Sequence, residues 1–305
     1  MPLDADLLLD RRRLKRRISF WRALAVLVGA VLIFALAGLR EPGGLLPGAA
    51  HVARLEVTGF IGDDRDVQEA LDRVRRDDSV RAVLVAIDSP GGSVAGGEAL
   101  HASLAQLAAV KPVVAVMGGT AASAAYMAAL PAERIFAREA TVTGSIGVIL
   151  QSFDASDLLA WLGVRVEMLT SGPFKGQPSP FRPLDDAGRA ELRRIVADLH
   201  EQFVARVAAG REMPPDRVRE LADGRIFTGR QAVALGLVDA IGGEREARAW
   251  LAEAHGVPAG LPLRDIETRS FTERTFGAAI GAALRAVVGE WLVVDRVRAL
   301  WQPLI

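Results

Sequence analysis

The sequence predicts an α/β fold with a mostly parallel sheet, preceded by one N-terminal transmembrane helix. Three observations support this prediction. Strand-like runs alternate with helix-like runs along most of the chain, which is the order of elements in α/β domains. Several of the strand-like runs are apolar throughout, as in strands that are covered on both faces. One uncharged stretch near the N-terminus has the composition of a membrane span.

The N-terminal end is predicted to hold the chain in a membrane. Residues 23–39 are 17 residues without a charge, close to the shortest helix that crosses the hydrocarbon core. Residues 1–22 contain seven Arg or Lys residues and three Asp residues, so this basic segment is expected to stay in the cytoplasm. A cleaved signal peptide is the alternative, but residues 40–42 make a poor cleavage site. We therefore expect a single-pass protein of the inner (cytoplasmic) membrane whose larger part is extracytoplasmic (periplasmic).

A Gly- and Pro-rich linker over residues 40–51 is followed by the alternating elements. The predicted strands are 54–59, 82–87, 112–117, 134–137, 146–150 and 164–170. The predicted helices are 67–76, 96–109, 122–129, 186–209, 215–222, 230–235 and 244–255. Residues 259–305 form a C-terminal extension in which charges interrupt two apolar stretches. We expect this extension to pack as a helix on the body or on a neighbouring subunit, or to lie on the membrane surface.

The composition excludes several kinds of chemistry. The chain has no cysteine, which removes disulfides, thiolate nucleophiles and Cys-ligated metals. Its four histidines are far apart in the sequence and no HExxH motif is present, so we expect no metal site. Neither a Walker A motif nor GxGxxG occurs, and the chain after its N-terminal segment is slightly acidic. We therefore expect no cofactor and no nucleic-acid partner.

Two Gly- and Ser-containing turns are predicted to meet at one edge of the sheet. Asp88–Ser93 follows the strand that ends at residue 87, and Gly118–Ser123 follows the strand that ends at residue 117. In an open parallel sheet, ligand sites form at the carboxyl ends of the strands. Paired glycines let the backbone turn sharply and expose its N–H groups. Ser123 would then start a helix beside N–H groups that can stabilise an oxyanion, although a simple helix cap is the alternative.

A serine nucleophile needs a base, and Lys175 is the strongest candidate for it. Lys175 lies in a loop after the predicted strand 164–170, which places it at the same edge of the sheet. Only three of the 37 basic residues are lysines, a weak indication that a lysine here does what Arg cannot, such as losing its proton. Burial among apolar groups destabilises an ammonium, and a neutral amine can accept the serine proton. His101 and His200 lie on predicted helices and not at strand ends, so they are weaker candidates.

Five separated strings of the sequence, taken together, are similar to one known family. They are Ile87–Val94 (IDSPGGSV), Met117–Tyr126 (MGGTAASAAY), Thr143–Val148 (TGSIGV), Ser171–Pro183 (SGPFKGQPSPFRP) and Asp223–Asp239 (DGRIFTGRQAVALGLVD). With these strings the sequence resembles the signal peptide peptidase A family of serine peptidases, of the short single-unit bacterial type, in the Clp protease/crotonase superfamily. The resemblance covers residues 52–255 and implies a Clp/crotonase-like βαβ superhelix as a peptidase domain over residues 52–258.

The resemblance also implies a role for each candidate site residue. Ser123 would be the nucleophile and Lys175 the general base, with Ser145 orienting Lys175 through a hydrogen bond. The oxyanion hole would be formed by backbone N–H groups of Ala124 and of Gly91 or Gly92. No metal and no cofactor is implied.

The sequence departs from the family's pattern directly after the nucleophile. The family usually has Ser-Gly-Gly-Tyr, whereas this chain has Ser123-Ala124-Ala125-Tyr126. The Ala124 N–H is still available, so the departure puts the side-chain preference in doubt and not the activity. Tyr126 is expected to be either a wall of the site or a packing residue.

Hydrophobic peptides, such as cleaved signal peptides left in the membrane, are the substrates that the resemblance implies. It also implies a ring-like homo-oligomer whose sites are completed across subunit contacts. Three alternatives remain: a related peptidase of the same superfamily that acts on membrane proteins, a crotonase-like acyl-CoA enzyme, and a non-catalytic scaffold. The intact Ser123 and Lys175 argue against the last two.

Overall fold

The computed structural model describes Trp21 and residues 49–268. The predicted anchor at 23–39, nearly all of the cytoplasmic segment and the linker, and the chain from residue 269 onward lie outside the described residues. Contacts divide the chain into two compact units, residues 1–49 and 50–305, and the description below concerns the second. In the part of the chain that the structure describes, no helix combines the length and the apolar character needed to cross a bilayer.

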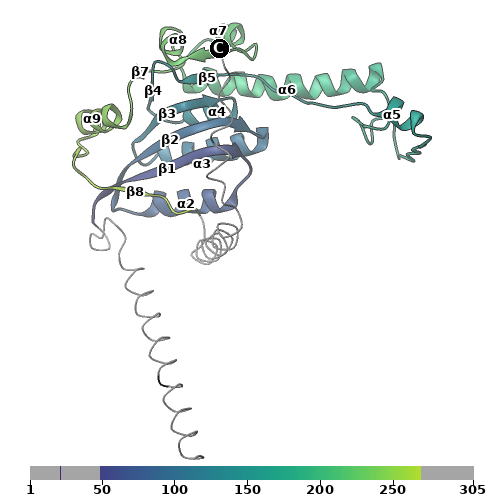
Figure 1. The fold of residues 1–305 in the computed structure, drawn as a ribbon. Coiled ribbons are helices and arrows are strands. Elements are labelled where there is room, and N and C mark those ends of the chain that lie inside the picture. The colour runs from purple at the N-terminus through teal and green to yellow at the C-terminus, as the bar shows by residue number, and fades with distance from the viewer. Residues whose placement is uncertain (1–20, 22–48, 269–305) are drawn as a thin grey trace, which may run out of the picture. The chain divides into compact units, whose positions relative to one another are not determined.

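Among the described residues, an eight-stranded, mostly parallel sheet forms the centre of the body, which confirms the prediction of an α/β fold with a mostly parallel sheet (Figure 1). Its strands are β1 (His51–Ile61), β2 (Val80–Gly92), β3 (Val113–Ala122), β4 (Arg134–Ala137), β5 (Val142–Gly144), β6 (Ile226–Thr228), β7 (Ala240–Ile241) and β8 (Leu263–Asp265). The main path runs β6-β5-β3-β2-β1-β8, with β4 and then β7 branching from β3. The β5–β6 pairing is antiparallel and the others are parallel. Through β8 the sheet continues past residue 258, where the sequence placed the end of the domain.

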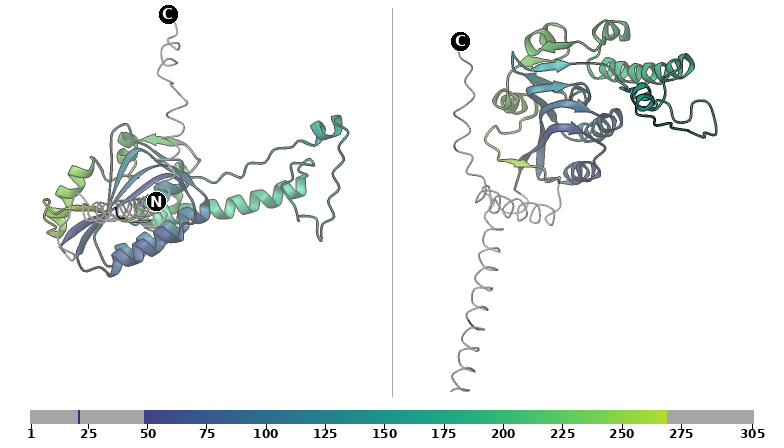
Figure 2. Two further views of the ribbon diagram at one scale, coloured as in Figure 1. Left: turned by 60° about the horizontal axis from the view of Figure 1, so that its bottom comes forward. Right: turned by 45° about the vertical axis from the view of Figure 1, so that its right-hand side comes forward.

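Helices cover both faces of this sheet, which explains its apolar strands. The helices are α2 (Arg65–Arg76), α3 (Val94–Ala108), α4 (Ala124–Ala129), α5 (Ser156–Trp161), α6 (Asp186–Gly210), α7 (Pro215–Leu221), α8 (Gly229–Ala234) and α9 (Glu244–His255). Alternate residues of the central strands pack with α2, α3 and α4 on one face, and the residues between them pack with α9 on the other (Figure 2). Side chains along a strand point to opposite faces in turn, so a strand covered on both faces reads as an unbroken apolar run.

The two predicted turns are the last residues of longer strands. β2 continues to Gly92 and β3 to Ala122, beyond the predicted ends at residues 87 and 117. The pairing of β2 with β3 shifts its register between Ile87 and Ser89. A bulge of this kind bends a strand without ending it. The Gly and Ser residues therefore mark a change of direction inside the sheet, and the two segments leave the sheet together at its carboxyl edge.

An arm, defined here as residues 147–185 with the first turns of α6, extends away from the sheet (Figures 1 and 2). The predicted strands 146–150 and 164–170 are wrong, because both segments are irregular. Their apolar side chains are largely exposed, with Ile149 at 91% and Leu169 at 92% of full exposure. A run of apolar residues indicates that a segment is covered, but not what covers it. Ile146 is buried in the core, but the other apolar side chains of the two segments are partly or largely exposed.

Replacing Tyr126 with Phe tests the packing of α4 against the body. The Tyr126 hydroxyl is fully buried and donates a hydrogen bond to the Leu237 carbonyl at 2.9 Å. We expect Tyr126→Phe to lower the free energy of unfolding by about 1 kcal/mol, because a buried acceptor loses its donor. Urea denaturation of the full chain in detergent measures this change. Removal of the exposed Ser171 hydroxyl in Ser171→Ala is the control, and equal stability of both variants would contradict the prediction.

Candidate active site

Ser123 joins β3 to α4 in a strained backbone conformation. Its φ of 55° and ψ of −123° lie outside the regions that residues with a side chain adopt freely. Among the described residues, the non-glycine residues with positive φ are Ser123, Ser145 and Glu212. Two of these three are residues that the sequence predicts for the site. Ser123 occupies the N-cap position of α4, but its side chain makes no capping hydrogen bond, so the hydroxyl is not used to hold the helix.

The neighbouring strand and the buried helix hold Ser123 in this conformation. The Ser123 N–H donates to the Gly144 carbonyl of β5 at 2.9 Å, and the Thr143 hydroxyl donates to the Ala121 carbonyl at 2.7 Å. Every residue of α4 is buried. A strained backbone costs on the order of 1–3 kcal/mol and persists only where the surrounding contacts over-determine it. Tyr126 belongs to these contacts, so it is a packing residue and not a wall of the site, and its burial raises the pKa of its hydroxyl.

Gly91 brings the end of β2 against Ser123, as the sequence predicts for the two Gly- and Ser-containing segments. A Cβ atom at Gly91 would lie 2.9 Å from the Ser123 Cβ and 2.9 Å from the Ala122 carbonyl oxygen. The φ of Gly91 is 115°, a conformation that glycine adopts without steric cost. Glycine is therefore required at this position both for space and for backbone geometry.

The directions of the backbone N–H groups favour Gly92 over Gly91 as an oxyanion donor. The Gly91 N–H donates to the Ser89 hydroxyl at 3.1 Å, and that hydroxyl donates to the Gly59 carbonyl of β1 at 2.6 Å. The Ser93 N–H also points to β1, where it donates to the Ile61 carbonyl at 2.9 Å. Successive N–H groups along a strand point to opposite sides. The Gly92 N–H therefore points to the β3 side, where Ser123 lies.

Ala124 supplies the second N–H group beside Ser123. It is in the first turn of α4, where an N–H group has no acceptor within its own helix. A Cβ atom at Gly91 would lie 3.2 Å from the Ala124 nitrogen, so this N–H group is close to the end of β2. The Ala124 methyl group faces α3, where a Cβ atom at Gly97 would lie 2.8 Å from it. This methyl group is buried, so it fills space in the core and does not narrow the site.

Ser145 lies directly after β5 and faces the same cleft as Ser123. Its φ is 49°, and its N–H donates to the Arg225 carbonyl at 2.9 Å. The cleft has a volume of about 970 Å³. It is lined by Phe60, Pro90, Gly91, Gly92, Ser93, Val94, Ser123, Ser145, Gly147, Val148, Ile149, Leu150, Ser152, Leu184, Arg189, Leu192, Arg193, Val196, Ala197, His200, Ala222, Asp223 and Gly224. The nucleophile candidate therefore lines a groove in which apolar residues predominate.

Lys175 is not among the residues that line this cleft. It lies in the arm, and its side chain is exposed. The predicted position at the carboxyl edge of the sheet is wrong, because the preceding residues 164–170 are not a strand. Its N–H donates to the Gly172 carbonyl at 3.1 Å in a local turn. Within one chain, the structure brings Ser123, Ser145 and the glycines together but does not add Lys175 to them.

His200 lines the cleft, which its position within a helix did not indicate. Its Nε2 lies 2.7 Å from the Ala222 carbonyl oxygen, so this nitrogen carries the proton and donates it to that acceptor. The neighbouring Asp223 accepts hydrogen bonds from Arg225, which lower the pKa of Asp223 to about 2. His101 lies on α3, away from this cleft, and burial lowers the pKa of its imidazole.

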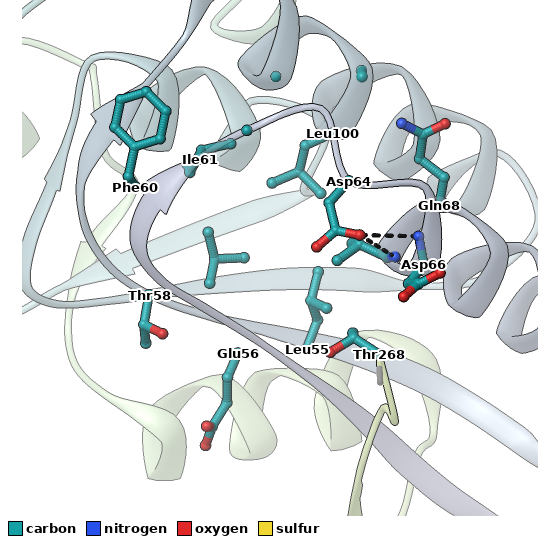
Figure 3. A pocket seen from close by; sticks show the side chains of 15 residues that line it. Leu55, Glu56, Thr58, Phe60, Ile61, Asp64, Asp66, Gln68, Leu100 and Thr268 are labelled. Carbon is teal, nitrogen blue, oxygen red and sulfur yellow. Dashed lines mark hydrogen bonds between the residues drawn. The ribbon is translucent and has the colours of Figure 1, made fainter. Parts of the chain in front are cut away.

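A second cavity lies between β1, α2 and α3 and has a volume of about 380 Å³ (Figure 3). Its acidic residues include Glu56, Asp64 and Asp66, and the Asp64 carboxylate accepts hydrogen bonds from the first N–H groups of α2. The Asp64 carboxylate is thus used as a helix cap. Neither Ser123 nor Ser145 lines this cavity, so the chemistry that the sequence predicts is not located there. Residues 49–268 contain no cluster of His, Asp and Glu side chains placed to hold a metal ion.

Comparison with known proteins identifies related chains. Residues 105–258 match the model of peptidase family S49. A candidate protease of Synechocystis sp. is 42% identical over 219 residues, which are 71% of this chain and 79% of the relative. A candidate signal peptide peptidase SppA of Enterococcus faecium is 37% identical over 210 residues, which are 64% of this chain and 61% of the relative. The chain thus spans less than two thirds of this second relative. A solved ClpP1 structure from Listeria monocytogenes has 16% identity and a TM-score of 0.41, and covers 64% of this chain and 93% of its own.

Replacing Gly91 with Ala tests the approach of β2 to Ser123. The added methyl group would meet Ser123 and Ala122 at 2.9 Å, so we expect the turn to shift and kcat/KM for an apolar fluorogenic peptide to fall roughly a hundred-fold. Gly260→Ala, where the new Cβ meets no atom within 4 Å, is the matched control. Circular dichroism would verify that both variants fold. Unchanged activity of a folded Gly91→Ala variant would show that this contact does not shape the site.

Proposed function

The chain belongs to peptidase family S49 and is a serine peptidase, and we propose that Ser123 is its nucleophile and Lys175 its general base. The assignment of Ser123 rests on its conformation and surroundings. Ser123 has a strained backbone, its hydroxyl does not cap α4, and the end of β2 lies against it. Strain of this kind is concentrated at functional sites, because it is costly and serves no purpose in packing alone.

The proposed mechanism uses only groups of the chain and one water molecule. The neutral amine of Lys175 removes the proton of the Ser123 hydroxyl, and the oxygen attacks the carbonyl carbon of a peptide bond. The oxyanion accepts hydrogen bonds from the N–H groups of Gly92 and Ala124. The Lys175 ammonium then protonates the leaving amine, the C–N bond breaks, and an acyl-enzyme remains. Water, deprotonated by the same amine, hydrolyses the ester and restores Ser123.

Lys175 is proposed to reach Ser123 from a neighbouring subunit of a ring-like homo-oligomer. Two features support this arrangement. Lys175 is exposed on the arm and does not line the cleft of its own chain. The arm also exposes large apolar side chains, including Phe153 and Trp161, which a second copy would cover. Insertion of the arm into a neighbour's cleft would bury the lysine, and burial favours its neutral form. Ser145, which lines that cleft, would orient it.

Apolar peptides, such as signal peptides after their release, are the proposed substrates. The cleft supports this choice, because Val148–Leu150 and the α6 residues Leu192, Val196 and Ala197 contribute apolar side chains to its walls. The proposed anchor at residues 23–39 would hold the peptidase at the inner (cytoplasmic) membrane, with its catalytic domain on the extracytoplasmic side. Substrates that partition into that membrane would then be concentrated near the cleft.

Single substitutions test the dyad. We expect Ser123→Ala and Lys175→Arg each to lower kcat for an apolar fluorogenic peptide by roughly a thousand-fold or more, because Arg cannot act as a base. Lys111→Arg is the matched control, because the Lys111 ammonium only donates to the carbonyls of Asp77 and Val80. Activity that survives in Lys175→Arg and is lost in His200→Gln would move the base to His200. No hydrolysis by folded wild type would favour the acyl-CoA enzyme or the scaffold.

Mixing two inactive variants tests whether the dyad forms between subunits. Ser123→Ala subunits supply Lys175, and Lys175→Ala subunits supply Ser123. Random assembly across a head-to-tail interface should restore about a quarter of the wild-type activity. Each variant alone, refolded in the same way, is the control. If the mixture stays inactive while it forms the same oligomer as wild type, the dyad forms within one chain.

A further inference from the structure

The face of α6 that lines the cleft carries two arginines without a carboxylate partner. The lining positions of this helix, 189, 192, 193, 196, 197 and 200, form one stripe along it. Within residues 49–268, the Arg189 side chain has only the Leu184 carbonyl as partner, at 3.4 Å, and the Arg193 side chain has none. Arg194, the next residue, pairs with Glu191 and does not line the cleft.

Some arginines of the described residues have a carboxylate partner and others do not, and Arg189 and Arg193 are the two that line the cleft. Arginines with a carboxylate partner are Arg54, Arg75, Arg76, Arg194, Arg206, Arg211, Arg217, Arg219, Arg225, Arg230 and Arg245. The cleft's one acidic residue, Asp223, is paired with Arg225. Like charges four positions apart repel each other on a helix. The cleft therefore presents two exposed guanidinium groups that have no carboxylate partner among residues 49–268, and an anionic ligand would neutralise their charges.

The helix geometry gives the distances of the two arginines from His200 along α6. His200, at the other end of the stripe, donates to Ala222, and Gly224 donates to the Ile146 carbonyl, so this end adjoins Ser145. A helix rises 1.5 Å per residue, which places Arg193 about 10 Å and Arg189 about 16 Å from His200 along α6. An extended peptide spans about 3.3 Å per residue. An extended peptide lying along α6 would therefore need about three to five residues to run from the level of His200 to the arginines.

Resting on the proposed function, we propose that Arg189 and Arg193 form an anion subsite that binds a carboxylate of the peptide substrate. Leu192, Val196 and Ala197 line the cleft on the same stripe of α6, so the preferred substrate has an apolar stretch next to a negative charge. Guanidinium groups bind carboxylates through paired, charge-assisted hydrogen bonds. The carboxylate is either the free end of a peptide chain or the side chain of an Asp or Glu residue.

Peptide binding to the uncleaving Ser123→Ala variant tests the subsite. The full chain in detergent would be titrated with fluorescent apolar peptides that differ in one group: a C-terminal acid against an amide, and Glu against Gln with an amide end. We expect one of the acidic peptides to bind roughly ten-fold more tightly than its neutral partner, by fluorescence anisotropy, and the difference to shrink in high salt. Combining Ser123→Ala with Arg189→Gln and Arg193→Gln should remove the difference. Combining Ser123→Ala with Arg194→Gln, the matched control, should preserve the difference in affinity between acidic and neutral peptides.

The outcomes separate the subsite from the peptidase activity. Preference for the C-terminal acid identifies the end of the chain as the ligand, and preference for Glu identifies a side chain. Equal binding of acidic and neutral peptides overturns the subsite, and so does a preference that persists without Arg189 and Arg193. If acidic and neutral peptides bind equally and wild type cleaves both equally, the proposed peptidase function holds and the subsite does not. Wild type that cleaves no peptide, while the arginine-dependent preference is present, overturns the proposed function and leaves the subsite.

Discussion

The close approach of Gly91 to Ser123 is the contact on which the rest of the site depends. It requires a residue without a side chain, a bulge that redirects β2, and a serine that accepts a strained backbone. The pairing of β3 with β5 holds that serine from the other side. Because these constraints come from the ladder of the sheet, the N–H groups of Gly92 and Ala124 are fixed before any ligand arrives. Preorganised donors of this kind lose little free energy to reorganisation during a reaction.

The parts of the site that come from the sheet could be predicted from the sequence. Unbroken apolar runs identified β2 and β3, because strands with both faces covered leave that pattern. The residues that follow them, including Gly91 and Ser123, were then placed at one edge by the geometry of parallel strands alone. What the sequence could not provide was the bulge at Ile87–Ser89, since a change of pairing register leaves no mark in composition. The predicted strand ends were therefore too early.

The arm and α6 could not be predicted in the same way. Residues 146–150 and 164–170 have the apolar character of buried strands, yet both segments are irregular, and apart from the buried Ile146 their apolar side chains are partly or largely exposed. An apolar sequence pattern indicates that a segment is buried, but it does not show whether the residues that bury it belong to the same chain. The same argument misplaced Lys175, whose expected position depended on residues 164–170 being a strand. His200 was passed over for a related reason, because lining a cleft from within a helix depends on how the long α6 packs against distant segments.

The exposure of the arm has a consequence for the activity of a subunit that has not yet assembled. If the base comes from a neighbour, a newly made subunit carries a nucleophile that nothing can activate. The enzyme is then its own zymogen, without a propeptide, and assembly takes the place of proteolytic activation. Below the concentration at which subunits associate, such a chain would leave other polypeptides intact. Control over its activity would then lie in its local concentration, which the proposed membrane anchor would raise, and need not involve a dedicated inhibitor.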